Sequence, residues 1–246
     1  MRKIRLIARL DIKNSNLIKS INLEGLRIVG DPNTFAKKYY QDGIDELVFM
    51  DCVATLYGRN NLYNIINTAT KDIFIPITVG GGVRSLEDAR NILNCGADKI
   101  AVNTAAVIKP EFISELANVL GSQSVVLSVE AKKRNENHWE VYTNNGRELT
   151  GWDVFEWIKR AVSLGVGEIL LTSIDKEGTR KGFDIELIRL ASQITEVPII
   201  ASGGLGKVND LIDVINIGKA DAAAVADAIH YKRISVKELK NTIMKF

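Results

Sequence analysis

Short runs of apolar, mostly β-branched residues recur along the whole chain, and each has the length of one buried strand. The eight runs are IRLIARLD (4–11), ELVFMD (46–51), IPITVGG (75–81), KIAVN (99–103), SVVLSVE (124–130), EILLTSI (168–174), PIIASGG (198–204) and AAAVAD (222–227). Most of them are separated by stretches with the helical period of about 3.6 residues, such as 85–96 and 153–165. Strands that alternate with helices predict a parallel sheet covered by helices.

Eight strand–helix units in 246 residues are the number needed to close a (β/α)8 TIM barrel. The two halves of the chain also resemble each other. The matching segments are ELVFMD (46–51) with EILLTS (168–173), VGGG (79–82) with SGGL (202–205), GADKIAV (96–102) with KADAAAV (219–225), and the strand ending at Asp11 with the strand ending at Glu130. We therefore predict one domain over 1–246, built from half-barrels of about 1–120 and 121–246. An open doubly wound sheet is the alternative, but it would not require matching halves.

Composition narrows the class of protein only a little. The chain is 46% hydrophobic and 25% charged, as in an ordinary globular protein, and its net charge of +2 indicates neither a nucleic-acid nor a membrane partner. Cys52 and Cys95 form neither a disulfide framework nor a metal-ligand pattern, so we expect a reduced, cytoplasmic setting without a metal or organic cofactor. The apolar part of the first 13 residues is too short for a signal peptide or a membrane span.

Two carboxylates stand at related strand ends. Asp11 closes the first predicted strand and Glu130 closes the fifth, which lie opposite each other in an eight-stranded barrel. The active site of such a barrel lies at the carboxyl ends of its strands. A carboxylate at a strand end often only caps the following segment, but the repeat places both residues at the same position of their halves. We therefore predict that Asp11 and Glu130 act as a general acid and a general base.

Two glycine turns predict phosphate sites. The segments 79–82 and 202–205 follow the third and seventh strands, and backbone N–H groups exposed in such turns bind anions. One turn alone would be a weak signal, but the repeat relates the two and predicts an elongated ligand with a phosphate at each end. Asn103 and Thr104 add donors to the first site, whereas the repeat places Asp227 where Thr104 stands. A carboxylate repels phosphate by about 4 kcal/mol at about 4 Å and an effective dielectric of about 20, so we predict that the second site is weakened or lost.

Charged residues of alternating sign occur at the opposite ends of four strands. They are Arg5, Glu46, Lys99 and Glu168. Salt bridges at a barrel rim are common and contribute little, which is the simplest interpretation of these residues. If the four side chains point inward, they form a ring that closes the bottom of the barrel and controls passage along its axis.

These residues lie in stretches that resemble the cyclase subunit of imidazole glycerol phosphate synthase (HisF) from end to end. The stretches are RLDIK (9–13), DELVFMD (45–51), FIPITVGGGVRSLEDA (74–89), GADKIAVNTAAV (96–107), GEILLTSID (167–175) and IIASGG (199–204). The resemblance implies a barrel made of duplicated halves with a HisH-like glutaminase on its lower face. Ammonia would then travel up the barrel axis and meet a bis-phosphorylated ribulosylamine-type substrate at the upper face.

The resemblance also implies roles for individual residues. Asp11 would be one of the acid–base pair, and Lys19 would lie on a long loop after the first strand that closes over the ligand. The gate at the ammonia entrance matches without replacement and consists of Arg5, Glu46, Lys99 and Glu168. The residues expected to bind the ligand and its phosphates are Lys19, Asp51, Gly82, Asn103, Thr104, Thr172, Glu177, Gly178, Gly203, Gly204 and Asp227.

Departures from the family pattern fall almost entirely in the upper site. Glu130 and Glu177 replace aspartates, Asp227 replaces a serine, Arg9 replaces a cysteine, and 14–16 read Asn-Ser-Asn instead of Asp-Gly-Arg. The extra methylene of Glu130 displaces its carboxylate by about 1.5 Å, and a misplacement of about 1 Å can lower a rate on the order of 100-fold. Period-2 alternation puts Arg9 on the inner face with Asp11, where a buried guanidinium needs a carboxylate partner, and we expect Asp227 or Glu130.

Three functions fit a chain whose gate residues match the family pattern while the residues at the carboxyl ends of its strands depart from it. Our main interpretation is a HisF-like subunit resembling the WbuZ type, which supplies ammonia from the glutaminase to a sugar amidotransferase for a bacterial surface sugar while its own cyclase reaction is impaired. The second is a working cyclase subunit of histidine biosynthesis, and the third is a non-catalytic scaffold for a glutaminase. The related isomerase barrel of the preceding step fits the 74–89 and 167–175 stretches less well. We expect a phosphorylated small molecule at the upper face.

Overall fold

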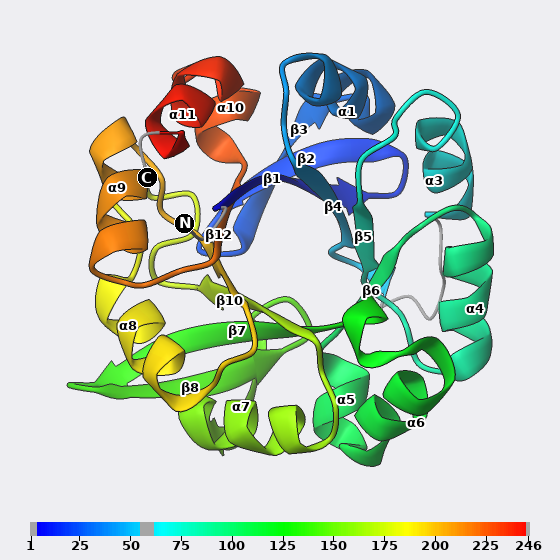
Figure 1. Ribbon diagram of the computed structural model, residues 1–246, viewed down its shortest axis with the longest axis vertical. Helices are drawn as coiled ribbons and strands as arrows, with labels where there is room; N and C mark the ends of the chain where they lie inside the picture. Colours follow the sequence, from blue (N-terminus) through cyan, green and yellow to red (C-terminus); the bar gives the residue numbers. More distant parts are fainter. Residues whose placement is uncertain (1–3, 55–61, 245–246) are drawn as a thin grey trace.

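All eight apolar runs form strands in the computed structural model, which describes residues 4–54 and 62–244. The barrel strands are β1 (Arg5–Lys13), β4 (Glu46–Asp51), β5 (Ile77–Gly80), β6 (Lys99–Val102), β7 (Val125–Asn135), β10 (Glu168–Ser173), β11 (Ile199–Ser202) and β12 (Ala222–Val225). Each strand pairs in parallel with the next, and the pairing of β12 with β1 closes the ring (Figure 1). The predicted (β/α)8 barrel is therefore confirmed.

Helices cover the outside of the ring (Figure 1). They are α1 (Pro32–Gln41), α3 (Tyr63–Ala69), α4 (Leu86–Asn94), α5 (Thr104–Ile108), α6 (Glu111–Leu120), α7 (Val154–Ser163), α8 (Ile185–Ile194), α9 (Val208–Asn216), α10 (Asp227–His230) and α11 (Val236–Ile243), with a 3-10 turn η1 at Ser122–Ser124. The side chains of Ser85 and Asp153 accept hydrogen bonds from the first N–H groups of α4 and α7, which fixes where these two predicted helices begin. Within the described ranges, no helix has the length and apolarity needed to cross a membrane.

Alternation along each barrel strand divides its side chains between two cores. In β1, Leu6, Ala8 and Leu10 face the surrounding helices, whereas Ile7 faces the barrel interior. The interior cluster consists of Ile7, Val48, Ala101, Val126, Leu170, Ile200, Ala222 and Ala224. This apolar layer fills the middle of the barrel, so the inward-facing polar residues lie below it or above it.

Two antiparallel hairpins extend the barrel and were not predicted. The first adds β2 (Asn16–Ile21) and β3 (Glu24–Gly30) to β1, and the second adds β8 (His138–Thr143) and β9 (Glu148–Asp153) to β7. Both follow strands that the internal repeat relates, although the origin from two half-barrels stays a prediction.

The hairpins correct three expectations about the upper face. Asp11 and Glu130 do not close their strands, because β1 continues to Lys13 and β7 to Asn135. Each strand continues because it pairs with its hairpin, Asp11 opposite Ile18 and Glu130 opposite Tyr142. For the same reason Lys19 lies in a buried strand rather than on a long loop.

Candidate active site at the barrel mouth

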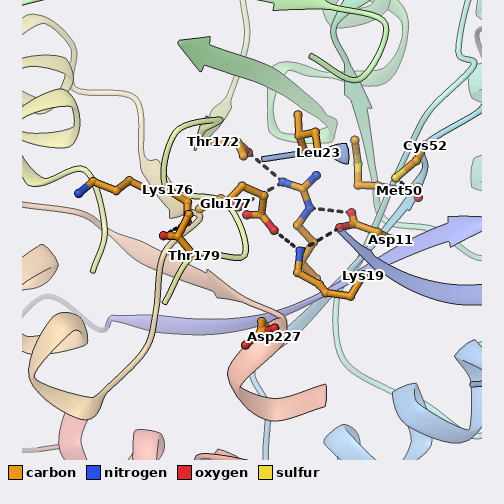
Figure 2. A network of polar contacts seen from close by, with 12 residues as sticks. Asp11, Lys19, Leu23, Met50, Cys52, Thr172, Lys176, Glu177, Thr179 and Asp227 are labelled. Carbon is orange, nitrogen blue, oxygen red and sulfur yellow. Dashed lines mark hydrogen bonds and ion pairs between the residues drawn. The ribbon is translucent and has the colours of Figure 1, made fainter. Parts of the chain in front are cut away.

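Four buried charged side chains form one network at the upper end of the barrel. Nε of Arg9 donates to Oδ1 of Asp11 at 2.8 Å. Nζ of Lys19 lies 3.6 Å from Oδ2 of Asp11 and also pairs with Glu177 (Figure 2). None of the four exposes more than 3% of its surface. Because a buried charge needs a partner, two cations and two carboxylates stabilise one another here.

Arg9 reaches further across the barrel than the sequence indicated. Its Nη1 donates to Oγ1 of Thr172 on β10 at 2.9 Å and to Oγ of Ser202 on β11 at 3.2 Å. Its carboxylate partner is Asp11, so the prediction of Asp227 or Glu130 is wrong. Asp11 lies two residues further along the same inner face of β1, and this short separation lets Nε reach it directly.

The two expected partners of Arg9 are bound elsewhere. Asp227 is the first residue of α10, where its carboxylate accepts a hydrogen bond from Nη1 of Arg233 at 2.8 Å and lies 3.8 Å from Nε of Arg180. Glu130 accepts a hydrogen bond from the backbone N–H of Gly146 at 2.8 Å. Each carboxylate therefore has its own local donor.

The network determines which groups carry charge. Burial alone would raise the pKa of Asp11, but the cations Arg9 and Lys19 outweigh burial and hold that pKa below its usual value. Burial likewise opposes the charge of Lys19, but Glu177 and Asp11 raise the pKa of its ammonium group. Asp11 is therefore an ionised carboxylate and Lys19 a cation at neutral pH.

Glu130 has the opposite environment. Burial raises the pKa of its carboxyl group to about 7, even though the Gly146 N–H and the Arg9 charge favour the ionised form. At neutral pH Glu130 can hold or release a proton, whereas Asp11 stays ionised. Two carboxyl groups with separated pKa values are suited to one acid and one base, and their catalytic roles remain a prediction.

The raised pKa of Glu130 predicts a pH-dependent stability. The folded protein keeps this proton up to about pH 7, whereas the unfolded chain releases it near pH 4.5, so Glu130 lowers the free energy of unfolding as pH rises through that window. The Glu130→Gln variant has no such proton to lose. We therefore expect its free energy of unfolding, relative to that of wild type, to rise by on the order of 3 kcal/mol between about pH 4.5 and about pH 8. Urea unfolding at both pH values measures this, and an equal difference at the two would contradict it.

The larger cavity of the mouth lies over β4 to β7 and has a volume of about 130 Å³. It brings together five predicted site residues, which are Asp51, Gly82, Asn103, Thr104 and Glu130. In the turn beside this cavity, steric constraints require glycine at position 81. Gly81 has a φ of 97°, and a Cβ on it would lie 2.3 Å from the backbone oxygen of Asp51. The backbone of this turn therefore packs directly against the end of β4.

The smaller cavity lies over β10 to β12 and has a volume of about 20 Å³. The predicted residues in its lining are Lys19, Glu177, Gly178, Gly203, Gly204 and Asp227. Arg180 also lines it, and Arg180 and Arg233 partly neutralise the Asp227 carboxylate. Weakened phosphate binding at this cavity stays a prediction. Thr172 lines neither cavity and is fully buried as an acceptor for Arg9.

Sequence analysis missed the residues that the second hairpin contributes. Asn144 and Asn145 line the larger cavity, and the N–H of Asn144 donates to Oγ1 of Thr104 at 3.2 Å. The Asn145-Gly146 pair is a strong signal for a hairpin turn and could have revealed them. Arg180 and Arg233 were also missed, and no motif marks them as partners of Asp227.

The four charged residues at the lower end do point into the barrel. Arg5 contacts Glu46 at 2.8 Å and Glu168 at 2.5 Å, while Lys99 contacts the same carboxylates at 3.1 and 2.9 Å. Each cation bridges both carboxylates, so the ring expected from the sequence is present, and it lies below the apolar layer. Its action as a gate stays a prediction.

Comparisons with known proteins assign the family. Residues 5–235 match the family of histidine biosynthesis proteins. The chain is 59% identical over 210 residues to imidazole glycerol phosphate synthase subunit HisF of Legionella pneumophila, covering 85% of this chain and 99% of that protein. The chain belongs to the HisF family. HisF of Streptococcus sanguinis is 44% identical over 243 residues, which are 99% of this chain and 96% of that protein.

Membership of the HisF family confirms the family resemblance seen in the sequence. It does not support the narrower resemblance to the WbuZ type, because both relatives carry the name of imidazole glycerol phosphate synthase and neither name refers to a surface sugar. The comparisons therefore favour the second of the three functions over the main interpretation drawn from the altered mouth.

Proposed function

We propose that this HisF-family chain is the cyclase subunit of an imidazole glycerol phosphate synthase and receives ammonia from a HisH-type glutaminase at its lower face. The observation that carries the proposal is the pair of buried carboxyl groups at the mouth, ionised Asp11 and Glu130 with a pKa of about 7. The names of the two relatives support the same reaction.

The barrel's own residues suit each stage of this reaction. Ammonia is small and uncharged, so it can cross the apolar layer between the ring at the lower end and the mouth. Ammonia first condenses with a carbonyl carbon of the substrate to form an imine, in which two protons leave the nitrogen and the carbonyl oxygen leaves as water. Asp11 is the group able to accept a proton, and Glu130 is the group able to donate one. The glycine turns and Thr104 would hold the phosphates.

One observation favours a second function. Asp11 is bound by both Arg9 and Lys19, and a base engaged in two ion pairs is less free to accept a proton from a substrate. A barrel of this kind could pass ammonia to a separate acceptor, such as a sugar amidotransferase, without cyclising a substrate itself. The named relatives do not support this alternative, so the cyclase is the function we propose.

Transfer through the barrel predicts that glutamine nitrogen reaches the product without mixing with the solution. The test combines this chain with a HisH-type glutaminase, glutamine labelled with ¹⁵N in its amide, and unlabelled ammonium at neutral pH, at a concentration well below the one that drives turnover without the glutaminase. We expect mass spectrometry to find ¹⁵N in most of the imidazole product, because ammonium ions are too strongly hydrated to compete through an apolar layer. Product with the isotopic composition of the medium would contradict transfer through the barrel.

A further inference from the structure

The two cavities of the mouth meet at one residue. The larger cavity is lined from β4 to β7 and the smaller from β10 to β12. Among the described residues, Arg9 is the one that lines both. Its side chain therefore stands between the glycine turn at 79–82 and the glycine turn at 202–205.

Arg9 is held in this place from two sides. On its own strand Nε donates to Asp11. Across the barrel, past β12, Nη1 donates to Ser202 on β11 and to Thr172 on β10, the next strand beyond β11. Thr172 is fully buried and Ser202 is 3% exposed, so both acceptors are fixed by packing. We call Arg9 together with its bonds to Thr172 and Ser202 the crossbar.

The Lys19–Glu177 pair also lies between the two cavities, on the side of the smaller one. Lys19 contacts Asp11 and Glu177, and both Lys19 and Glu177 line that cavity (Figure 2). The wall between the cavities is thus a set of charged groups that already have partners. A ligand that extends through it has to break some of these contacts.

We propose that Arg9 is a specificity-determining residue whose crossbar must open before one ligand can occupy both cavities, so that the intact crossbar weakens the binding of a bis-phosphate relative to a mono-phosphate. The inference rests on the proposed function, because it concerns the substrate of the same mouth. A ligand with one phosphate can bind at Gly82 and Thr104 while the crossbar is intact. A bis-phosphate has to place its second phosphate near Gly203 and Gly204, on the far side of Arg9.

Simple attraction between charges predicts the opposite preference. If Arg9 acted only as a cation, it would favour the ligand with more phosphates, and its removal would weaken the bis-phosphate more. If Arg9 acts as the crossbar, a bis-phosphate has to break hydrogen bonds of a charged group before it binds. Removing Arg9 abolishes that cost, so the affinity for the bis-phosphate should rise by about 10- to 100-fold relative to the affinity for the mono-phosphate. The direction of the change therefore separates the two roles.

The test measures dissociation constants by calorimetry for ribulose 5-phosphate and for the elongated bis-phosphorylated ribulosylamine substrate, which carries one phosphate at each end. The variants are Arg9→Met and the double variant Thr172→Val/Ser202→Ala, which releases the crossbar but keeps the Arg9–Asp11 pair. Arg84→Met is the matched control, because Arg84 lines the larger cavity outside the crossbar. We expect the preference for the bis-phosphate to rise about tenfold or more in both crossbar variants and not in the control.

Several results would overturn the inference. They are a preference for the bis-phosphate that is unchanged or lower in the crossbar variants, a rise of the same size in Arg84→Met, and failure of both probes to bind any variant. If Arg9→Met does not fold because Asp11 loses a partner, the double variant decides. The proposed function is tested separately by cyclase turnover, so an active cyclase with an unchanged preference would overturn the inference alone.

Discussion

Replacing Asp11 by asparagine is expected to lower the ammonia-driven cyclase rate by on the order of 100- to 10,000-fold, because it removes the ionised base of the mouth. Asparagine has nearly the same shape, and its amide oxygen can still accept the hydrogen bond from Nε of Arg9. Glu177 remains as a carboxylate partner for Lys19. The measurement is kcat with saturating ammonium salt and the bis-phosphorylated substrate, with circular dichroism to show that the barrel is folded.

A carboxylate on the outside of the barrel provides the control. Asp72 forms an exposed pair with Lys37 at 2.7 Å, so Asp72→Asn removes the same chemical group without changing the mouth. Its cyclase rate should equal that of wild type. A rate for Asp11→Asn within about threefold of wild type would show that Asp11 is not the base, because loss of a general base has a much larger effect.

Replacing Glu168 by alanine is expected to lower the free energy of unfolding by about 3 kcal/mol or more. Glu168 is 5% exposed and contacts both Arg5 and Lys99, so its removal leaves two cations sharing the single carboxylate of Glu46. The two cations remain partly open to solvent, which places the cost at the lower end of the range for a broken buried pair. Urea unfolding at neutral pH measures the change.

The matched control for Glu168 is a surface glutamate. Glu186 pairs with Arg189 on α8 at 2.7 Å, and their side chains are 42% and 35% exposed. Solvent screens an exposed pair of this kind, so Glu186→Ala should have a small effect. Equal effects of Glu168→Ala and Glu186→Ala would mean that the ring at the lower end contributes no more than a surface salt bridge.

The barrel was predictable because its strands are short, continuous apolar runs and most of the segments between them have the helical period of about 3.6 residues. Because successive side chains of a strand point to opposite faces, Arg5, Ile7, Arg9 and Asp11 share the inner face of β1, and the structure places them there. The charged ring follows from the same rule applied to four parallel strands. Strand register alone is enough to bring these residues together.

The partners of long side chains were not predictable in this way. Alternation shows that Arg9 points inward, but it does not say whether the guanidinium turns along β1 toward Asp11 or across the barrel toward Glu130. In the structure it does the first with Nε and contacts β10 and β11 with Nη1. The raised pKa of Glu130 could not be predicted either, because it depends on how completely the carboxyl group is buried, which the spacing of the motifs does not give.

The central claim is that the mouth of this barrel is a cyclase site, and the most direct test is turnover by the wild-type chain alone. Saturating free ammonia and the bis-phosphorylated ribulosylamine substrate remove any need for the glutaminase, so the assay reports only on the upper face. Our account predicts formation of the imidazole product at a rate that Asp11→Asn abolishes. Absence of turnover and of substrate binding would contradict it and would favour a subunit that only conducts ammonia.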